Sequence, residues 1–274
     1  MTCYLYSAGP ELKQPGRFLA RSFRDLRESA APAWALFVSG LRADHRRSWL
    51  GYLWLVIPAV GLATLCSFML SQRVVTVMPT KLPYPLFVLS GMVLWQTFVD
   101  GLNAPLEQLK RARQLITRSV VPHEAVIGAG VIQAILNAVV RLSALGIVFA
   151  VFGLPVPASA LLFPLGVLAV LVTGVAAGLA VAPLGLLYDD VGRGIFLATS
   201  FLFFLTPVAY PLPERRLFHL NPLVALMDTA RGWLIDGSVG VAAFAAIFAT
   251  ATAGLVLAWL FYRIARPHLV ARLG

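Results

Sequence analysis

Charged residues are scarce in this chain. They make up 12% of its 274 residues, whereas hydrophobic residues make up 59%; a typical soluble domain carries about 25% charged residues. The mean hydropathy of +0.82 shows that the chain is strongly apolar on average. The composition therefore predicts an integral membrane protein.

Residues that commonly carry chemistry are few and scattered. The sequence has two cysteines and four histidines, without the spacing of a disulfide framework or of a metal motif. It lacks a GxxxxGK[ST] loop, so we do not expect this chain to bind ATP through a Walker motif. A membrane-embedded transferase would need clustered acidic or histidine residues, but the adjacent pair Asp189 and Asp190 has no partner motif. We therefore do not expect an enzyme, or a cofactor or metal bound by this chain; if ATP drives the protein, a partner supplies the ATPase.

Long apolar runs dominate the sequence. A hydrocarbon layer of roughly 30 Å needs about 20 apolar residues at about 1.5 Å per residue. Six runs come near that length, and none alternates as barrel strands do. They cover residues 50–71, 84–102, 125–152, 160–188, 194–210 and 239–262. Because unpaired backbone groups are costly in lipid, we expect an all-α membrane protein with six transmembrane helices.

The remaining segments predict three flanking elements. Residues 1–49 form a cytoplasmic segment in which residues 17–28 have the spacing of an amphipathic interface helix; the alternative is a basic anchor helix with no further role. Residues 212–238 are too polar to span, and their apolar residues recur at three and four, which predicts an external re-entrant helix. Residues 50–262 form the six-span domain, and residues 263–274 a cytoplasmic tail.

The basic residues predict the orientation. Sixteen Lys and Arg fall on the side of the two termini and five on the opposite side. The positive-inside rule then places both termini in the cytoplasm of a bacterial inner-membrane protein. The formal net charge of +10 is thus mainly a topology signal, and because these residues are dispersed among loops we expect no nucleic-acid partner.

Arg141 is the basic residue that falls near the middle of a predicted span. Burying an arginine there costs about 2.5–3.5 kcal/mol on insertion scales. One interpretation is contact with an anionic substrate or a lipid phosphate. The other is snorkelling or pairing with carbonyl groups. Asn137, one turn earlier, would share the same polar surface.

Five motifs, in order along the chain, resemble one family. They are RRSWLGYLW (46–54) with Pro58, YPLFVLSGMVLWQTF (84–98), ITRSVVPHEAV (116–126), FLFFLTPVAYPLP (201–213) and NPLVALMDTAR (221–231). Their order and depth resemble the membrane subunit of ABC-2 type exporters, in the branch that exports polysaccharides and polyol phosphates such as O-antigen, capsule and teichoic acid. The likeness covers nearly the whole chain. Two departures are Asp44 and His45 in a stretch that is usually basic, and Asp189 at a position that is usually arginine, with Arg193 as the candidate replacement charge.

The resemblance implies a half-transporter. Two copies would form the channel, and two copies of a separate ATPase, which bind ATP and Mg²⁺, would dock beneath it. The expected dock is a cytoplasmic coupling helix over about residues 107–120, with its contacts at Leu115, Ile116, Thr117 and Arg118. The alternative for this basic stretch is a patch that binds lipid headgroups.

Aromatic side chains are the expected substrate contacts, because sugar rings stack on aromatic planes without one fixed register. Together with Arg141, the predicted channel residues are Trp49, Tyr52, Trp54, Phe68, Phe201, Phe203, Phe204 and Tyr210. Packing or an interfacial aromatic belt is the alternative for each. Arg42, Arg46 and Arg47 are expected at the entrance, where they would bind the diphosphate of a lipid-linked glycan.

The expected function is export of a lipid-linked polysaccharide such as O-antigen. The alternative is an ABC-2 permease that exports capsule, teichoic acid or a small lipid-like or drug-like substrate.

Overall fold

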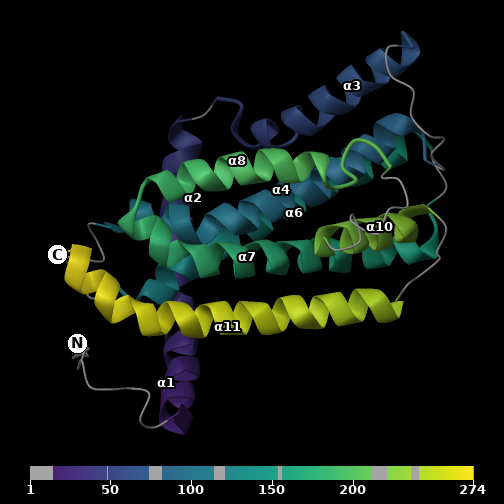
Figure 1. Ribbon diagram of the computed structural model, residues 1–274. Helices are drawn as coiled ribbons and strands as arrows, with labels where there is room; N and C mark the ends of the chain where they lie inside the picture. Colours follow the sequence, from purple (N-terminus) through teal and green to yellow (C-terminus); the bar gives the residue numbers. More distant parts are fainter. Residues whose placement is uncertain are drawn as a thin grey trace.

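The chain folds into an all-helical bundle (Figure 1). The structure, a computed structural model, describes residues 15–47, 49–73, 82–113, 121–153, 156–211, 221–235 and 241–273, and these contain no strand. The helices are α1 (Pro15–Glu28), α2 (Ala30–Arg47), α3 (Ile57–Ser71), α4 (Tyr84–Arg111), α6 (His123–Val151), α7 (Phe163–Leu187), α8 (Asp190–Phe204), α10 (Pro222–Ile235) and α11 (Val241–Leu273). Two short 3₁₀ helices, η2 (Gly51–Leu55) and η3 (Ala158–Leu162), precede α3 and α7.

Four helices are long and apolar enough to cross a membrane. They cover Tyr84–Arg111, His123–Val151, Ala158–Leu187 and Phe244–Leu269, and they correspond to four of the six predicted spans. The other two predicted spans contain the 15-residue helices α3 and α8. At about 1.5 Å per residue each is roughly 22 Å long, which is shorter than a hydrocarbon layer of about 30 Å.

The core lies between α4 and α7, which pack closely along most of their length. Glycines on α7 permit this approach: a Cβ on Gly174 or Gly178 would overlap the carbonyl oxygens of Phe98 and Leu102 on α4. α6 packs on another side of α4, and α11 packs on α7. α3 and α8 lie on the side of the bundle away from α11 (Figure 1).

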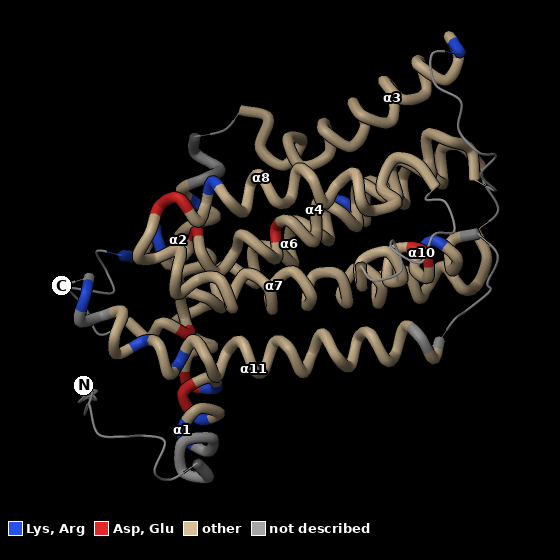
Figure 2. The backbone as a smooth tube through the Cα atoms, in the orientation of Figure 1, with Lys and Arg blue, Asp and Glu red and all other residues tan. Residues whose placement is uncertain are grey.

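α1 and α2 run across one end of the bundle, at a steep angle to the long helices (Figure 1). Most of the Lys, Arg, Asp and Glu residues that Figure 2 colours lie at this same end, although α3 and α10 carry a few at the other. Phe23 and Leu26 of α1 are 58% and 46% exposed, so part of its apolar surface points away from the bundle. The Phe23 ring also packs edge-to-face on Trp259 of α11, with ring centroids 5.7 Å apart, and the interface role predicted for residues 17–28 stays a prediction.

Two predicted boundaries look different in the structure. Residues 263–273, predicted as a tail, continue α11 without a break. Residues 107–111, predicted to begin the coupling helix, are the last turns of α4. α10 lies within the segment 212–238 that was predicted to be re-entrant, and its apolar residues Leu223, Leu226 and Met227 are buried.

Candidate functional site

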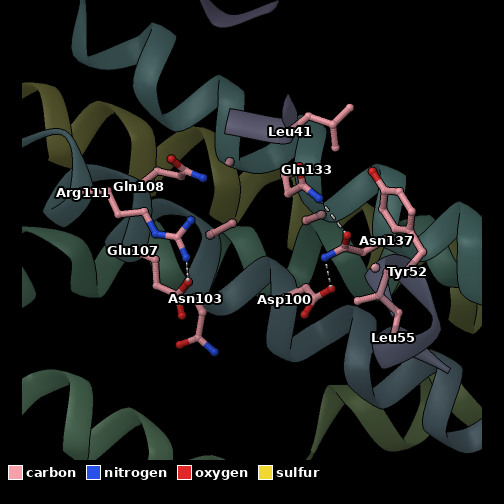
Figure 3. Close-up of a pocket in the computed structure, with 14 residues that line it drawn as sticks. Leu41, Tyr52, Leu55, Asp100, Asn103, Glu107, Gln108, Arg111, Gln133 and Asn137 are labelled. Carbon is pink, nitrogen blue, oxygen red and sulfur yellow. Dashed lines mark hydrogen bonds and ion pairs between the residues drawn. The ribbon is translucent and has the colours of Figure 1, made fainter. Parts of the chain in front are cut away.

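A polar pocket of about 320 Å³ opens between α2, η2, α4 and α6 (Figure 3). Much of its lining consists of amide and charged side chains, namely Asp100, Asn103, Glu107, Gln108, Arg111, Gln133 and Asn137. Leu41 of α2 and Tyr52 and Leu55 of η2 complete another side. Placing polar and ionisable side chains inside an apolar membrane bundle costs free energy, and such residues usually mark functional sites. This pocket is therefore the leading candidate for a functional site.

Helical spacing explains how the polar groups meet. Asp100, Asn103 and Glu107 are three and four residues apart, so α4 presents them on one face. Gln133 and Asn137 are four residues apart and share a face of α6. Because α4 and α6 pack against each other, the two polar stripes meet across the pocket.

Two glycines shape the walls. Gly51 has a φ of +48°, in the left-handed region that favours glycine, and it starts the turn that brings η2 and Tyr52 to the pocket. At Gly130 a Cβ would lie 2.7 Å from Gln108 Cγ and 2.8 Å from the Ala104 carbonyl oxygen. A glycine is therefore required for α6 to approach α4 beside the pocket.

Arg141 lies behind the pocket in an ion pair. Its Nη1 is 2.8 Å from Asp100 Oδ2, and its Nε donates to the Leu55 carbonyl oxygen at 3.4 Å. Asn137 Nδ2 donates to the same Asp100 oxygen at 3.0 Å, and Gln133 Nε2 donates to Asn137 Oδ1 at 3.0 Å (Figure 3). The pairing with a carbonyl group predicted for Arg141 is present, but its main partner is the carboxylate of Asp100 on α4.

The predicted channel aromatics occupy several environments. Tyr52 lines the pocket. Phe203 packs edge-to-face on Trp95 with ring centroids 5.6 Å apart, and the Tyr210 hydroxyl donates to the Phe204 carbonyl oxygen. The most exposed members lie before or on α3 and on α8: Trp49, Trp54, Phe68, Phe201 and Phe204. These rings therefore lie on the outer surface of the single chain.

The predicted entrance and docking residues are described only in part. Arg42 is exposed on α2. Arg46 and Arg47 belong to the same helix, with side chains outside the described set. The coupling residues Leu115, Ile116, Thr117 and Arg118 also lie outside the described residues.

Arg231 forms the centre of a buried junction at the other end of the bundle. It is 3% exposed, and it donates to the carbonyl oxygens of Phe87 at 3.2 Å, of Val208 at 2.8 Å and of Pro207. Its guanidinium also lies 3.9 Å from the centre of the Phe87 ring. Gly91 makes room for it, because a Cβ there would overlap the guanidinium. Arg231 thus ties α10 to α4 and to the turn after α8.

The charge of Arg231 survives this burial. Desolvation lowers the pKa of the guanidinium to about 10, and the nearby Asp228 opposes the shift, so the group stays protonated at pH 7. Tyr84 donates to the Ala209 carbonyl oxygen at 3.0 Å, and Asn221 Nδ2 donates to Thr206 Oγ1 at 3.2 Å. Three of the five motifs found in the sequence therefore meet at one junction, which we call the Arg231 junction.

A second junction, which the sequence did not reveal, joins α1, α6 and α11. Arg263 lies 2.5 Å from Asp25 Oδ2 and 3.2 Å from Glu124 Oε1, and Arg266 lies 3.2 Å from Glu124 Oε2. Glu124 is buried. These residues carry opposite charges, and they lie at helix ends that the sequence predicts on the same side of the membrane. That pattern was the signal available in the sequence.

Among the described residues, no group of three or more His, Cys, Asp and Glu side chains could hold a metal ion. The fold and the polar pocket define a class: an all-helical, multi-pass membrane protein with a hydrophilic recess inside an apolar bundle.

Comparison with known proteins narrows the class. The O-antigen export system permease protein RfbA of Myxococcus xanthus is 24% identical over 249 residues, covering 88% of this chain and 94% of that protein. Two proteins of the same name from Klebsiella pneumoniae are 22% and 23% identical over 207 and 205 residues, covering 73% and 72% of this chain. No family model matches the sequence. The chain is thus a distant, near full-length homologue of export-system permeases, which confirms the resemblance drawn from its motifs.

Proposed function

We propose that this chain is the permease subunit of an ABC transporter that exports a lipid-linked polysaccharide such as O-antigen across the inner membrane. The observation that carries the proposal is the similarity to the Myxococcus xanthus O-antigen permease over 94% of that protein. Separate ATPase subunits would bind ATP and Mg²⁺ and power the export, since this chain has no Walker loop.

The proposed topology has six spans with both termini in the cytoplasm. The gathering of charged residues at the end where α1 and α2 cross the bundle supports this orientation (Figure 2). The first proposed span would consist of η2 and α3, and the fifth would contain α8. α10 would then lie on the external side as a re-entrant helix.

The proposed assembly contains two copies of this chain and two ATPase subunits. Exposed aromatic residues on α3 and α8 support a channel between the copies, because Phe68 and Phe201 are 61% and 65% exposed on the surface of one chain. The ATPase would contact residues 115–118, and Arg42, Arg46 and Arg47 would meet the lipid diphosphate as it enters. The tail predicted over residues 263–274 would be the cytoplasmic end of α11.

Deletion of the gene in its host tests the function. We expect loss of surface O-antigen, accumulation of the lipid-linked glycan on the cytoplasmic side, and recovery of both when the wild-type gene is restored. Normal surface O-antigen in the deletion strain, with loss of capsule or teichoic acid instead, would reassign the substrate. Purification from native membranes in mild detergent should also yield an ATPase in equal stoichiometry, and repeated recovery of this chain without an ATPase would contradict the transporter assignment.

A further inference from the structure

We propose that the polar pocket between η2, α4 and α6 binds a neutral sugar unit of the transported glycan. The inference rests on the proposed function and adds which chemical part of the substrate this chain recognises. A lipid-linked glycan offers two kinds of polar group, a charged phosphate linkage and uncharged sugar hydroxyls. The charges, hydrogen-bonding groups and size of the pocket favour the second.

The charges around the pocket are already matched. Arg111 is the basic residue in the lining, and its Nη2 lies 3.7 Å from Glu107 Oε2. The other carboxylate, Asp100, is paired with Arg141 at 2.8 Å from behind the lining. A phosphate in this space would approach two carboxylates and would compete with them for cations that are already paired. Electrostatics therefore disfavour an anionic ligand here.

The amide side chains in the lining can form hydrogen bonds with sugar hydroxyls. Asn103, Gln108, Gln133 and Asn137 each carry an amide that can donate two hydrogen bonds and accept others. The bonds from Gln133 to Asn137 and from Asn137 to Asp100 leave part of that capacity unused. A sugar hydroxyl both donates and accepts, so adjacent amide and carboxylate groups can satisfy it in either direction.

The size and depth of the pocket also fit one unit rather than a polymer. Its volume of about 320 Å³ lies at the lower end of the roughly 300–1,000 Å³ usual for small-molecule sites. It follows α4 from Arg111 at the charged end to Asp100, eleven residues or about 16 Å along the helix axis. Tyr52 adds an aromatic ring to the wall, and aromatic planes accept the C–H faces of sugars. A single sugar could therefore enter from the end where α1 and α2 lie.

Site-specific photo-crosslinking in cells that make the glycan tests the occupancy. A photoreactive phenylalanine analogue replaces Gln133 in one variant and Val139 in another; both positions are on α6, and Val139 is 51% exposed on its outer surface. We expect a glycan-positive adduct at position 133 and none at 139. No adduct at 133, or equal adducts at both positions, overturns the proposal in favour of a water-filled recess.

A second measurement tests the chemistry. The purified complex with its ATPase, reconstituted in vesicles, is assayed for export of the lipid-linked glycan with undecaprenyl phosphate as competitor. Asn103→Leu should raise the KM for the glycan about tenfold, whereas Val139→Leu should leave export unchanged. An unaltered KM for the glycan in Asn103→Leu overturns the proposal, and so does an equal loss of inhibition by the sugar-free undecaprenyl phosphate, because the pocket would then recognise the lipid phosphate. If the wild-type complex exports no glycan at all, the proposed function fails as well, so the two failures are distinguishable.

Discussion

Arg231→Met tests whether the Arg231 junction holds α10 against the bundle. Methionine has a similar length but cannot donate, so the turn carbonyls of Pro207 and Val208 lose their donor. An unsatisfied buried acceptor costs about 1–3 kcal/mol, and the lost cation–π contact with Phe87 adds about 0.5–2 kcal/mol. Removing a buried charge offsets part of this loss. We therefore expect a net destabilisation of about 2–5 kcal/mol.

The assay is thermal unfolding of the purified protein in detergent, followed by tryptophan fluorescence. Trp95 on α4 and Trp233 on α10 are both buried and report on the two helices. At about 2–4 °C per kcal/mol for a chain of this size, the Tm should fall by roughly 5–15 °C. The matched control is Arg193→Met, which removes an ion pair whose arginine side chain is 85% exposed and should leave the Tm within about 2 °C. Equal Tm values for the two variants would refute the assignment of a stabilising role to Arg231.

Three further changes test other contacts. Glu124→Gln should weaken the contacts from α6 to Arg263 and Arg266 and cost about 1–3 kcal/mol, because Arg263 keeps its ion pair with Asp25; hydrogen exchange should then rise at the start of α6, and unchanged exchange there would contradict a tethering role. Asp100→Leu and Arg141→Leu should each lower the Tm, but the double variant should recover much of the loss because no lone charge stays buried; simple additivity would show that the two residues do not interact. Gly178→Val should separate α7 from the α4 backbone at a cost of about 1–3 kcal/mol or more, measured as a fall in monodisperse yield, and a wild-type elution profile would exclude that close approach.

Much of the fold was predictable because hydrophobic length is a strong signal in a membrane protein. The four long apolar helices fall where the sequence predicted spans. The fifth predicted span, residues 194–210, is helical only in part: α8 ends at Phe204 and an irregular turn containing Pro207 follows. Helix ends were harder to predict, since α4 and α11 continue past their apolar runs into charged sequence that contains Pro105 and Pro267.

The candidate site was only partly predictable. The sequence singled out Tyr52 and Arg141 and noted the nearby Asn137, and in the structure Tyr52 and Asn137 line one pocket, with Arg141 behind it. At the level of sequence, Asp100 was not connected with Arg141. Their pairing depends on the contact between α4 and α6, and no spacing along one helix encodes that contact.

The sequence by itself determined that this chain is a helical membrane protein, because composition and run length alone decide whether segments prefer lipid. It also determined the resemblance to polysaccharide exporters, through motifs that can be read without coordinates. Only the tertiary structure decided which charges are matched. Arg141, Arg231 and Arg263 are all buried arginines, yet their partners differ. Arg141 pairs with the Asp100 carboxylate at the polar pocket, Arg231 donates to carbonyl oxygens of the turn after α8, and Arg263 on α11 pairs with carboxylates on α1 and α6. The physical reason is that a buried charge is stabilised by neighbours distant in sequence, whose positions are set by packing between helices.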